Sequence, residues 1–297
     1  MLVTLALVAT LVFFALRLAP GGPFDGERVF PAEVKRNIEA RYGLDRPLIE
    51  QYSSWVGDVL RGDLRESFQY LGKPVNEILA ESLPVSVTLG SIALAFALLA
   101  GIPLGVLAAW KRGTAWDTSA MLLAVSGVSL PSYLVASLLI LLFSLHLGWL
   151  PPALWDEPGS WVLPAATLAL RPLALVARLT RASMIESLQA DWIRTAIAKG
   201  APNRVVLFHH ALRNSLIPVV SLVGPLAANL VTGSFLVETL FQIPGLGKHF
   251  VTAVLNRDYP LVMGTTLVYS VILVATNLVV DLGQAALDPR IRLEHQA

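Results

Sequence analysis

The pattern of hydrophobic positions divides the chain into long apolar runs separated by polar segments. Five runs are long enough for a helix to cross the ~30 Å hydrocarbon core of a bilayer, and they cover residues 85–110, 118–146, 161–179, 217–237 and 260–283. A shorter run covers residues 1–18. We interpret it as a first transmembrane helix because no basic residue precedes it, whereas a signal peptide, the open alternative, normally has a positive start. The pattern predicts an all-α multi-pass membrane protein with six transmembrane helices.

Residues 19–84 differ from these runs, because they are mixed polar and their basic and acidic side chains are balanced. Helical patterns cover residues 32–42, 47–60 and 74–83. We predict a small extracytoplasmic insert, followed by a five-helix core over residues 85–283. Two interpretations of the insert are open: a solvated cap without a ligand of its own, and a docking surface for a partner.

Composition supports the lipid bilayer as the surroundings of this chain. Hydrophobic residues make up 55% of the 297 positions, charged residues make up 14%, and the mean hydropathy is +0.65, which is too apolar for an ordinary soluble domain. The net charge of +1 gives no basic field that would favour nucleic acid as a partner. Cysteine is absent, which excludes a disulfide framework and a cysteine metal site.

Basic residues are distributed unevenly over the short loops. Two lie at 111–112, six lie in or beside residues 182–216, and two lie in the tail at 284–297, whereas the opposite short loops hold only Lys248 and Arg257. Short loops rich in Lys and Arg stay on the cytoplasmic side of a membrane. The distribution therefore predicts that residues 182–216, the tail and both termini are cytoplasmic.

The segment 182–216 shows helical periodicity on both sides of Gly200. Gly200 suits the left-handed residue that ends one helix, and Pro202 suits the first turn of the next. The side chains expected to pack against the protein lie three or four positions apart, and they are Ile185, Leu188, Trp192, Ala196 and Lys199. The pattern predicts a short helix–Gly–helix corner at the membrane surface.

Four stretches of sequence resemble a known family. They are RLAPGGP at 17–23, DWIRTAIAKGAP followed by HHALRNSLIPVV at 191–220, IPGLGKHFVTAVLNRDYPLV at 243–262, and LDPRIR at 287–292. Together they resemble the permease subunits of ABC importers, in the subfamily that carries dipeptides, oligopeptides and, in some members, nickel. The family's cytoplasmic coupling loop, the "EAA" loop, has Glu-Ala-Ala, three residues and Gly. The corresponding positions here hold Arg194, Thr195, Ala196 and Gly200, and Arg213 stands where the family pattern has Pro.

The resemblance implies a type I ABC-importer permease architecture in the inner membrane. It implies four kinds of partner: the bilayer, a second and non-identical permease, two cytoplasmic ATP-binding subunits, and an extracytoplasmic substrate-binding protein. It also implies that the coupling loop contacts the ATP-binding subunits through Asp191, Arg194, Thr195, Ala196, Lys199, Gly200, Ala201 and Pro202. Peptide is the cargo that the resemblance favours, and nickel or another small solute is the alternative.

The sequence predicts no enzyme and no cofactor or metal site in this chain. No phosphate-binding G-x-x-x-x-G-K-[ST] pattern occurs, so ATP and Mg²⁺ are expected to be used by the partner ATPases. His209 and His210 are adjacent, which points them about 100° apart on a helix and makes a shared metal unfavourable. A self-sufficient channel or secondary transporter is the alternative of another class, but no inverted repeat is visible and acidic residues are nearly absent from the spans.

Proline, glycine and polar residues interrupt several predicted spans, either as ordinary kinks or as parts of a pathway. The span 217–237 is the best candidate to line the pathway, because it combines polar side chains with a glycine that permits close helix approach. These residues are Gly224, Asn229, Thr232 and Ser234.

Arg171 falls near the middle of the span 161–179 and directly precedes Pro172. An arginine at that depth costs about 2.5–3.5 kcal/mol on insertion scales, so it needs a partner or water. We hypothesise that Arg171 lines the pathway and attracts an anionic group, such as the C-terminal carboxylate of a peptide. A partner in the second permease, or a side chain that reaches the interface, is the structural alternative.

Overall fold

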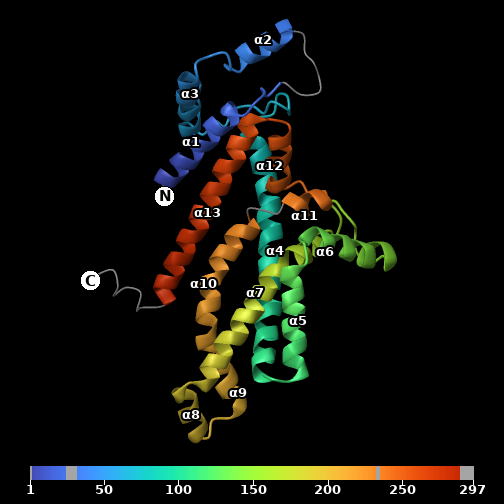
Figure 1. Cartoon of the computed structure of the whole chain (residues 1–297), viewed down its shortest axis with the longest axis vertical. Coiled ribbons are helices and arrows are strands. Elements are labelled where there is room, and N and C mark those ends of the chain that lie inside the picture. The colour runs from blue at the N-terminus through green and yellow to red at the C-terminus, as the bar shows by residue number, and fades with distance from the viewer. Residues whose placement is uncertain (1, 25–31, 232–234, 288–297) are drawn as a thin grey trace, which may run out of the picture. The chain divides into compact units, whose positions relative to one another are not determined.

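The computed structural model describes residues 2–24, 32–231 and 235–287 (Figure 1). Within these ranges the chain is helical, without a β-strand, and an isolated β-bridge joins Glu66 and Pro74. The predicted all-α class is therefore confirmed. The helices form two compact units, a first unit from the described parts of residues 1–86 and 244–272, and a second unit from the described parts of residues 87–243 and 273–297.

Four helical stretches are long and apolar enough to cross a membrane, and they are α4 (Val75–Trp110), α7 (Val162–Gln189), Asn203–Val231, and Tyr259–Val279 within α13 (Tyr259–Leu287). A fifth crossing is formed if the bent pair Ala115–Ser129 and Ser132–His146 is one span. Helix α1 (Leu2–Leu18) is apolar but shorter. Among the described residues, length and composition thus give four or five spans, and the predicted count of six is not confirmed.

The first unit is held together by an aromatic core. It contains α1, the start of α4, the first part of α13, and the shorter helices α2 (Ala32–Arg41), α3 (Leu48–Leu60) and α12 (Leu246–Leu255). Phe13 of α1 is fully buried, with ring centroids 5.1 Å from Tyr52 and 5.5 Å from Trp55 of α3. The buried Asp258 accepts hydrogen bonds from Ser67 Oγ and from the backbone N–H of Phe68, which ties the insert to the start of α13.

Helix α4 begins earlier than the sequence pattern predicts. The expected separate helix over 74–83 is the first part of α4, which continues through Pro84. The cause is tertiary packing, because Val75, Ile78 and Leu79 are buried in one cluster with Leu246 of α12. Apolar contacts therefore extend the helix past a proline that the sequence alone reads as a boundary.

The second unit is arranged around α7, which packs against both α5 and α10 (Figure 1). Its remaining elements are α5 (Ala115–Ser129), α6 (Ser132–Leu139), the π-helical η1 (Ile140–His146), α8 (Asp191–Ala198), α9 (Asn203–Val205), the π-helical η2 (Val206–Ala211), α10 (Leu212–Val231) and α11 (Phe235–Leu240). Helices α8 and α9 lie at one end of α7, and α6 and α11 lie towards the other (Figure 1).

Small residues let α4 approach α7 closely within the second unit. Ala93, Ala97, Gly101 and Gly105 recur every four residues along α4, so they lie on one face. A Cβ atom at Gly101 would lie 2.9 Å from the carbonyl oxygen of Leu173, and one at Gly105 would lie 2.5 Å from that of Ala177. We call this contact the α4–α7 seam. Such small-residue faces allow helix backbones to pack tightly in membranes.

Two predicted helical stretches are broken in the structure. The run 118–146 is bent by 109° between α5 and α6, because Leu130 takes an extended conformation (ψ 132°) before Pro131, as residues that precede proline tend to do. The helix expected to lead into Gly200 is interrupted at Ala190, which is also extended (ψ 148°).

Candidate functional site

The corner around Gly200 has the backbone conformation that the sequence predicts. Gly200 has φ +83°, and a Cβ atom there would meet nothing within 4 Å. Its N–H donates to the carbonyl of Ile197 (2.9 Å), and the N–H of Ala201 donates to that of Ala196 (3.1 Å), which satisfies carbonyls at the end of α8. Pro202 then precedes the next helix, and the N–H of Val205 donates to its carbonyl (2.9 Å). Glycine is needed here for its left-handed conformation and not for space.

Ile193 packs this corner against the rest of the second unit. It is 1% exposed and shares a cluster with Met184 of α7, Val106 of α4, and Leu207 of η2. The predicted packing stripe is wrong at two positions, because Trp192 is 42% exposed and Lys199 is exposed. The reason is the break at Ala190, which rotates α8 relative to α7 and turns the next side chain along, Ile193, inwards.

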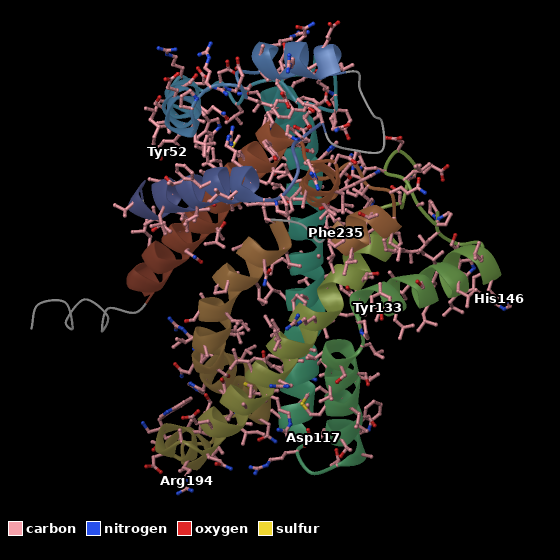
Figure 2. All side chains as sticks on the ribbon, turned by 45° about the horizontal axis from the view of Figure 1, so that its top comes forward. Tyr52, Asp117, Tyr133, His146, Arg194 and Phe235 are labelled. Atoms are coloured by element: carbon pink, nitrogen blue, oxygen red, sulfur yellow. The ribbon has the colours of Figure 1, made fainter. Side chains whose placement is uncertain are left out.

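The outer face of the corner mixes apolar and charged side chains. Of the eight predicted coupling residues, Asp191, Arg194, Thr195, Lys199, Gly200 and Pro202 are exposed, while Ala196 and Ala201 are half-buried. The same segment also exposes apolar side chains, and these are Trp192, Ile197, Val205 and Phe208. Arg194 lies at the tip of the unit (Figure 2) and makes an exposed 3.7 Å ion pair with Asp191. Contiguous exposed apolar surface with a polar rim is typical of a protein–protein interface.

An ion pair that sequence reasoning missed joins α5 to α7 in the same unit. Arg181 Nε donates to Asp117 Oδ1 (2.6 Å) and Arg181 Nη2 donates to Asp117 Oδ2 (2.8 Å), while the N–H of Gly113 donates to Oδ2 (3.0 Å). The Asp117 side chain is only 8% exposed. The signal in the sequence was an acid at the first turn of an apolar run, where an unpaired carboxylate would be costly.

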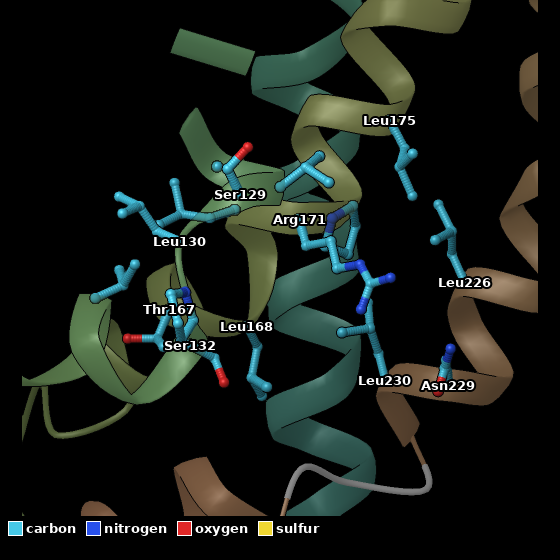
Figure 3. Close-up of a pocket in the computed structure, with 16 residues that line it drawn as sticks. Ser129, Leu130, Ser132, Thr167, Leu168, Arg171, Leu175, Leu226, Asn229 and Leu230 are labelled. Carbon is cyan, nitrogen blue, oxygen red and sulfur yellow. The ribbon is translucent and has the colours of Figure 1, made fainter. Parts of the chain in front are cut away.

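A cavity of about 470 Å³ lies between the α5–α6 corner, α7 and α10 (Figure 3). Arg171 lines it, and the guanidinium points from α7 towards α10, where Asn229 and Leu226 are found (Figure 3). The side chains of Arg171 and Asn229 are both exposed. Apolar side chains also line it, among them Leu130, Leu175 and Leu230.

The structure brings together only part of the predicted pathway set. Arg171 and Asn229 line the cavity. Gly224 is buried within α10 and does not line it. Thr232 and Ser234 lie outside the described residues. The sequence pattern singled out the polar groups of one span, whereas the cavity also draws on Ser129 and Ser132 at the α5–α6 corner, which becomes visible only once the chain bends at Pro131.

Known proteins are similar to this chain along most of its length. A family model described as "binding-protein-dependent transport system inner membrane component" matches residues 101–293. The chain is 45% identical over 293 residues to the dipeptide transport system permease protein DppB of Bacillus subtilis, covering 99% of this chain and 95% of that protein. It is 44% identical over 291 residues to the oligopeptide transport system permease protein OppB of Salmonella typhimurium, covering 97% and 95%.

Solved structures of more distant proteins have a similar fold. The inward-facing MetNI methionine ABC transporter matches with a TM-score of 0.59 at 16% identity, covering 71% of this chain and 96% of that one. An amino acid ABC transporter crystallised with histidines matches with a TM-score of 0.55 at 15% identity, covering 70% and 94%. These likenesses concern the fold alone.

Proposed function

We propose a function from the premise that this chain belongs to the binding-protein-dependent transport system inner membrane component family. The chain is the transmembrane permease subunit of an ATP-driven ABC importer for di- or oligopeptides, and it forms one half of the translocation pathway. The observation that carries this proposal is the 45% identity to a dipeptide permease, which extends over 99% of the chain.

The protein is a multi-pass membrane protein and a transport subunit, and its relatives are named as permeases rather than enzymes. We propose that ATP and Mg²⁺ are bound and used in two cytoplasmic ATPase subunits, and that this chain holds no cofactor. A second, non-identical permease and an extracytoplasmic binding protein complete the proposed complex.

The corner around Gly200 is the proposed contact with an ATPase subunit. Its exposed Trp192, Ile197 and Phe208 offer apolar contact area, and the same corner exposes the basic side chains of Arg194 and Lys199. Ile193 packs on Met184 and Val106, so a displacement of α8 would be transmitted directly to α7 and α4. A well-packed interior transmits such displacements because it has low compressibility.

Substitution of Gly200 tests the coupling role. Gly200→Val forces a β-branched residue into the left-handed region, which costs about 1–2 kcal/mol, so the native corner should be populated about five to thirty times less. Ala196→Asp places a charge on the proposed contact. Both variants should insert normally and lose copurifying ATPase and peptide uptake.

Gly148→Val is the matched control for Gly200→Val. Gly148 also has positive φ (+65°), and a Cβ atom there would also meet nothing within 4 Å. It comes two residues after His146, the last residue of η1, which lies far from Arg194 of the corner (Figure 2). It should retain ATPase copurification. Wild-type copurification and uptake in both corner variants would remove this corner from the coupling role.

We further propose that the corner is cytoplasmic, on the basis of the basic residues counted above. The chain has no cysteine, so single cysteines report without background. Asn203 and Asp156 are both exposed. An impermeant thiol reagent added to intact cells should label the variant Asp156→Cys and miss Asn203→Cys, and the reverse result would invert the proposed orientation.

A further inference from the structure

Arg171, in the wall of the cavity beside Pro172, is a cation for which the described residues provide no counter-charge. Arg171 lines the cavity, and within the described part of the chain it makes no hydrogen bond or ion pair. Arg181, further along the same helix, is held by two hydrogen bonds to Asp117. A guanidinium presents five N–H donors in a planar fork that matches a carboxylate. The free donors of Arg171 therefore make this cavity a site for an anionic group.

Two prolines add hydrogen-bond acceptors to the same wall. A helical carbonyl normally accepts from the N–H four residues later, and proline has none. Pro172, inside α7, therefore leaves the carbonyl of Leu168 without its usual donor. Gly127 lies in the last turn of α5, which ends at Ser129, and the residue four positions later is Pro131, so the carbonyl of Gly127 has no helical donor either. Leu168 and Gly127 both line the cavity. Residues that line the wall thus carry a cation and two carbonyl groups without a helical donor, and such carbonyls can accept hydrogen bonds from N–H donors.

The remaining surface and the size of the cavity limit the ligand further. Leu175, Leu226 and Leu230 provide apolar wall, and Asn229 adds an amide. The volume of about 470 Å³ lies within the roughly 300–1,000 Å³ of ordinary small-ligand pockets. A ligand that matches these features has a carboxylate, backbone-like N–H groups and small apolar side chains.

We propose that this cavity binds the C-terminal end of a peptide during its passage through the permease. Arg171 binds the terminal carboxylate, and the carbonyls of Gly127 and Leu168 accept hydrogen bonds from the peptide N–H groups. The choice of a peptide as ligand rests on the proposed function, whereas the preference for a carboxylate rests on Arg171 alone. The site recognises features common to all peptides, so it fits a permease that accepts many sequences.

A cysteine reporter tests this binding directly. The variant Ser129→Cys places a thiol in the cavity wall of a chain that has no other cysteine. It is labelled with a thiol reagent in membrane vesicles from cells that produce the full chain with its partner subunits, and labelling of this chain is quantified by mass spectrometry. Trialanine and trialanine C-terminal amide are the two probes, added without ATP.

We expect trialanine to slow labelling and the amide to be at least about tenfold less effective, because hydrogen bonds to charged groups are worth about that factor or more. Arg171→Gln should remove the difference between the two probes, and Arg171→Lys should keep a reduced preference for the free acid. Arg178→Gln is the matched control: Arg178 is also an exposed arginine of α7, two turns further along and outside the cavity. The Arg178→Gln variant should show the same difference between the two probes as the unsubstituted chain.

Equal protection by both probes, or a preference that survives Arg171→Gln, would overturn the proposal. The absence of any protection would also overturn it, as expected if a carboxylate of the second permease occupies Arg171. If Arg171→Gln fails to assemble, the acid–amide comparison with Arg171 in place still decides. Labelling requires neither ATP nor the binding protein, so it is measured separately from import. If vesicles import peptide but trialanine does not protect the cysteine from labelling, only this binding site is refuted. If trialanine protects the cysteine but the vesicles do not import peptide, only the proposed function is refuted.

Discussion

Helix α7 carries arginine in two opposite surroundings, and the comparison separates a structural charge from one that is available to a ligand. Arg181 lies where α7 packs on α5, and Asp117 holds it with two hydrogen bonds. Arg171 directly precedes Pro172, lines a cavity and is exposed. Both are arginines in an apolar helix, so composition cannot distinguish them. The difference arises from what the neighbouring helix places opposite each side chain.

The packing of the backbone also differs between the two arginines. Near Arg181 the α4–α7 seam is so close that a Cβ atom at Gly105 would lie 2.6 Å from Cβ of Thr180. Near Arg171 the helix carries Pro172, and the chain turns by 109° between α5 and α6 at Pro131. Tight packing fixes the position of Arg181, whereas Arg171, unpaired among the described residues, faces a cavity that both prolines line.

The largest effect is expected from placing a side chain in the α4–α7 seam. Gly105→Val places new atoms against the backbone of α7, 2.5 Å from the carbonyl oxygen of Ala177, and neither helix backbone can move away without separating the pair. Overpacking usually costs about 1–3 kcal/mol and more where backbone is hit. We expect loss of most of the folded protein in size-exclusion chromatography with fluorescence detection.

Gly57→Val is the control for this prediction, because Gly57 is also within a helix and a Cβ atom there would meet nothing within 4 Å. It should leave the yield of folded protein unchanged. A normal elution profile for Gly105→Val would show that α4 and α7 are not in the close contact described here.

An intermediate effect is expected from breaking the Asp117–Arg181 pair. Asp117→Asn keeps the size of the side chain but removes its charge, so Arg181 loses its counter-ion beside a side chain that is only 8% exposed. Hydrogen bonds to charged groups contribute about 1.5–3 kcal/mol, and we expect a loss of about 1–3 kcal/mol with a lower thermal midpoint in detergent.

A double-mutant cycle isolates the pair. Asp117→Asn and Arg181→Gln should each lower the thermal midpoint, and the double variant should lose less than the sum of the two, because the second change removes a charge that the first left unpaired. Simple additivity would contradict a direct interaction.

Sequence reasoning reached the local features of these sites and missed those that depend on contacts between distant segments. The left-handed Gly200 follows from local chemistry, and φ +83° confirms it. The break at Ala190 has no comparable signal, since alanine favours helix, and this is why Trp192 was expected inside and Ile193 was not. Asp117 and Arg181 are 64 residues apart, and a single sequence does not say which helix faces which.

The cavity shows the same limit. Arg171 was recognisable as a costly charge within an apolar run, and Pro131 and Pro172 were recognisable as interruptions. That the bend at Pro131 reaches 109°, and brings the corner of α5 and α6 to the same wall as Arg171, depends on packing between α5, α6 and α7. Gly224 was expected to face the pathway and is buried instead, because periodicity alone does not fix the rotation of a helix.

The smallest effect on stability is expected at Arg171, and it completes the comparison. Arg171→Gln removes no hydrogen bond or ion pair formed within the described residues, and the side chain is exposed. Substitutions of that kind usually change stability by less than about 0.5 kcal/mol. The thermal midpoint of the complex should therefore stay near that of the unsubstituted protein, whereas Arg181→Gln, the same change ten residues along α7, should lower it clearly by leaving Asp117 unpaired. If Arg171→Gln destabilises the complex as strongly as Arg181→Gln does, Arg171 has a structural partner in another subunit, and the distinction between a structural and a ligand-binding arginine on α7 is lost.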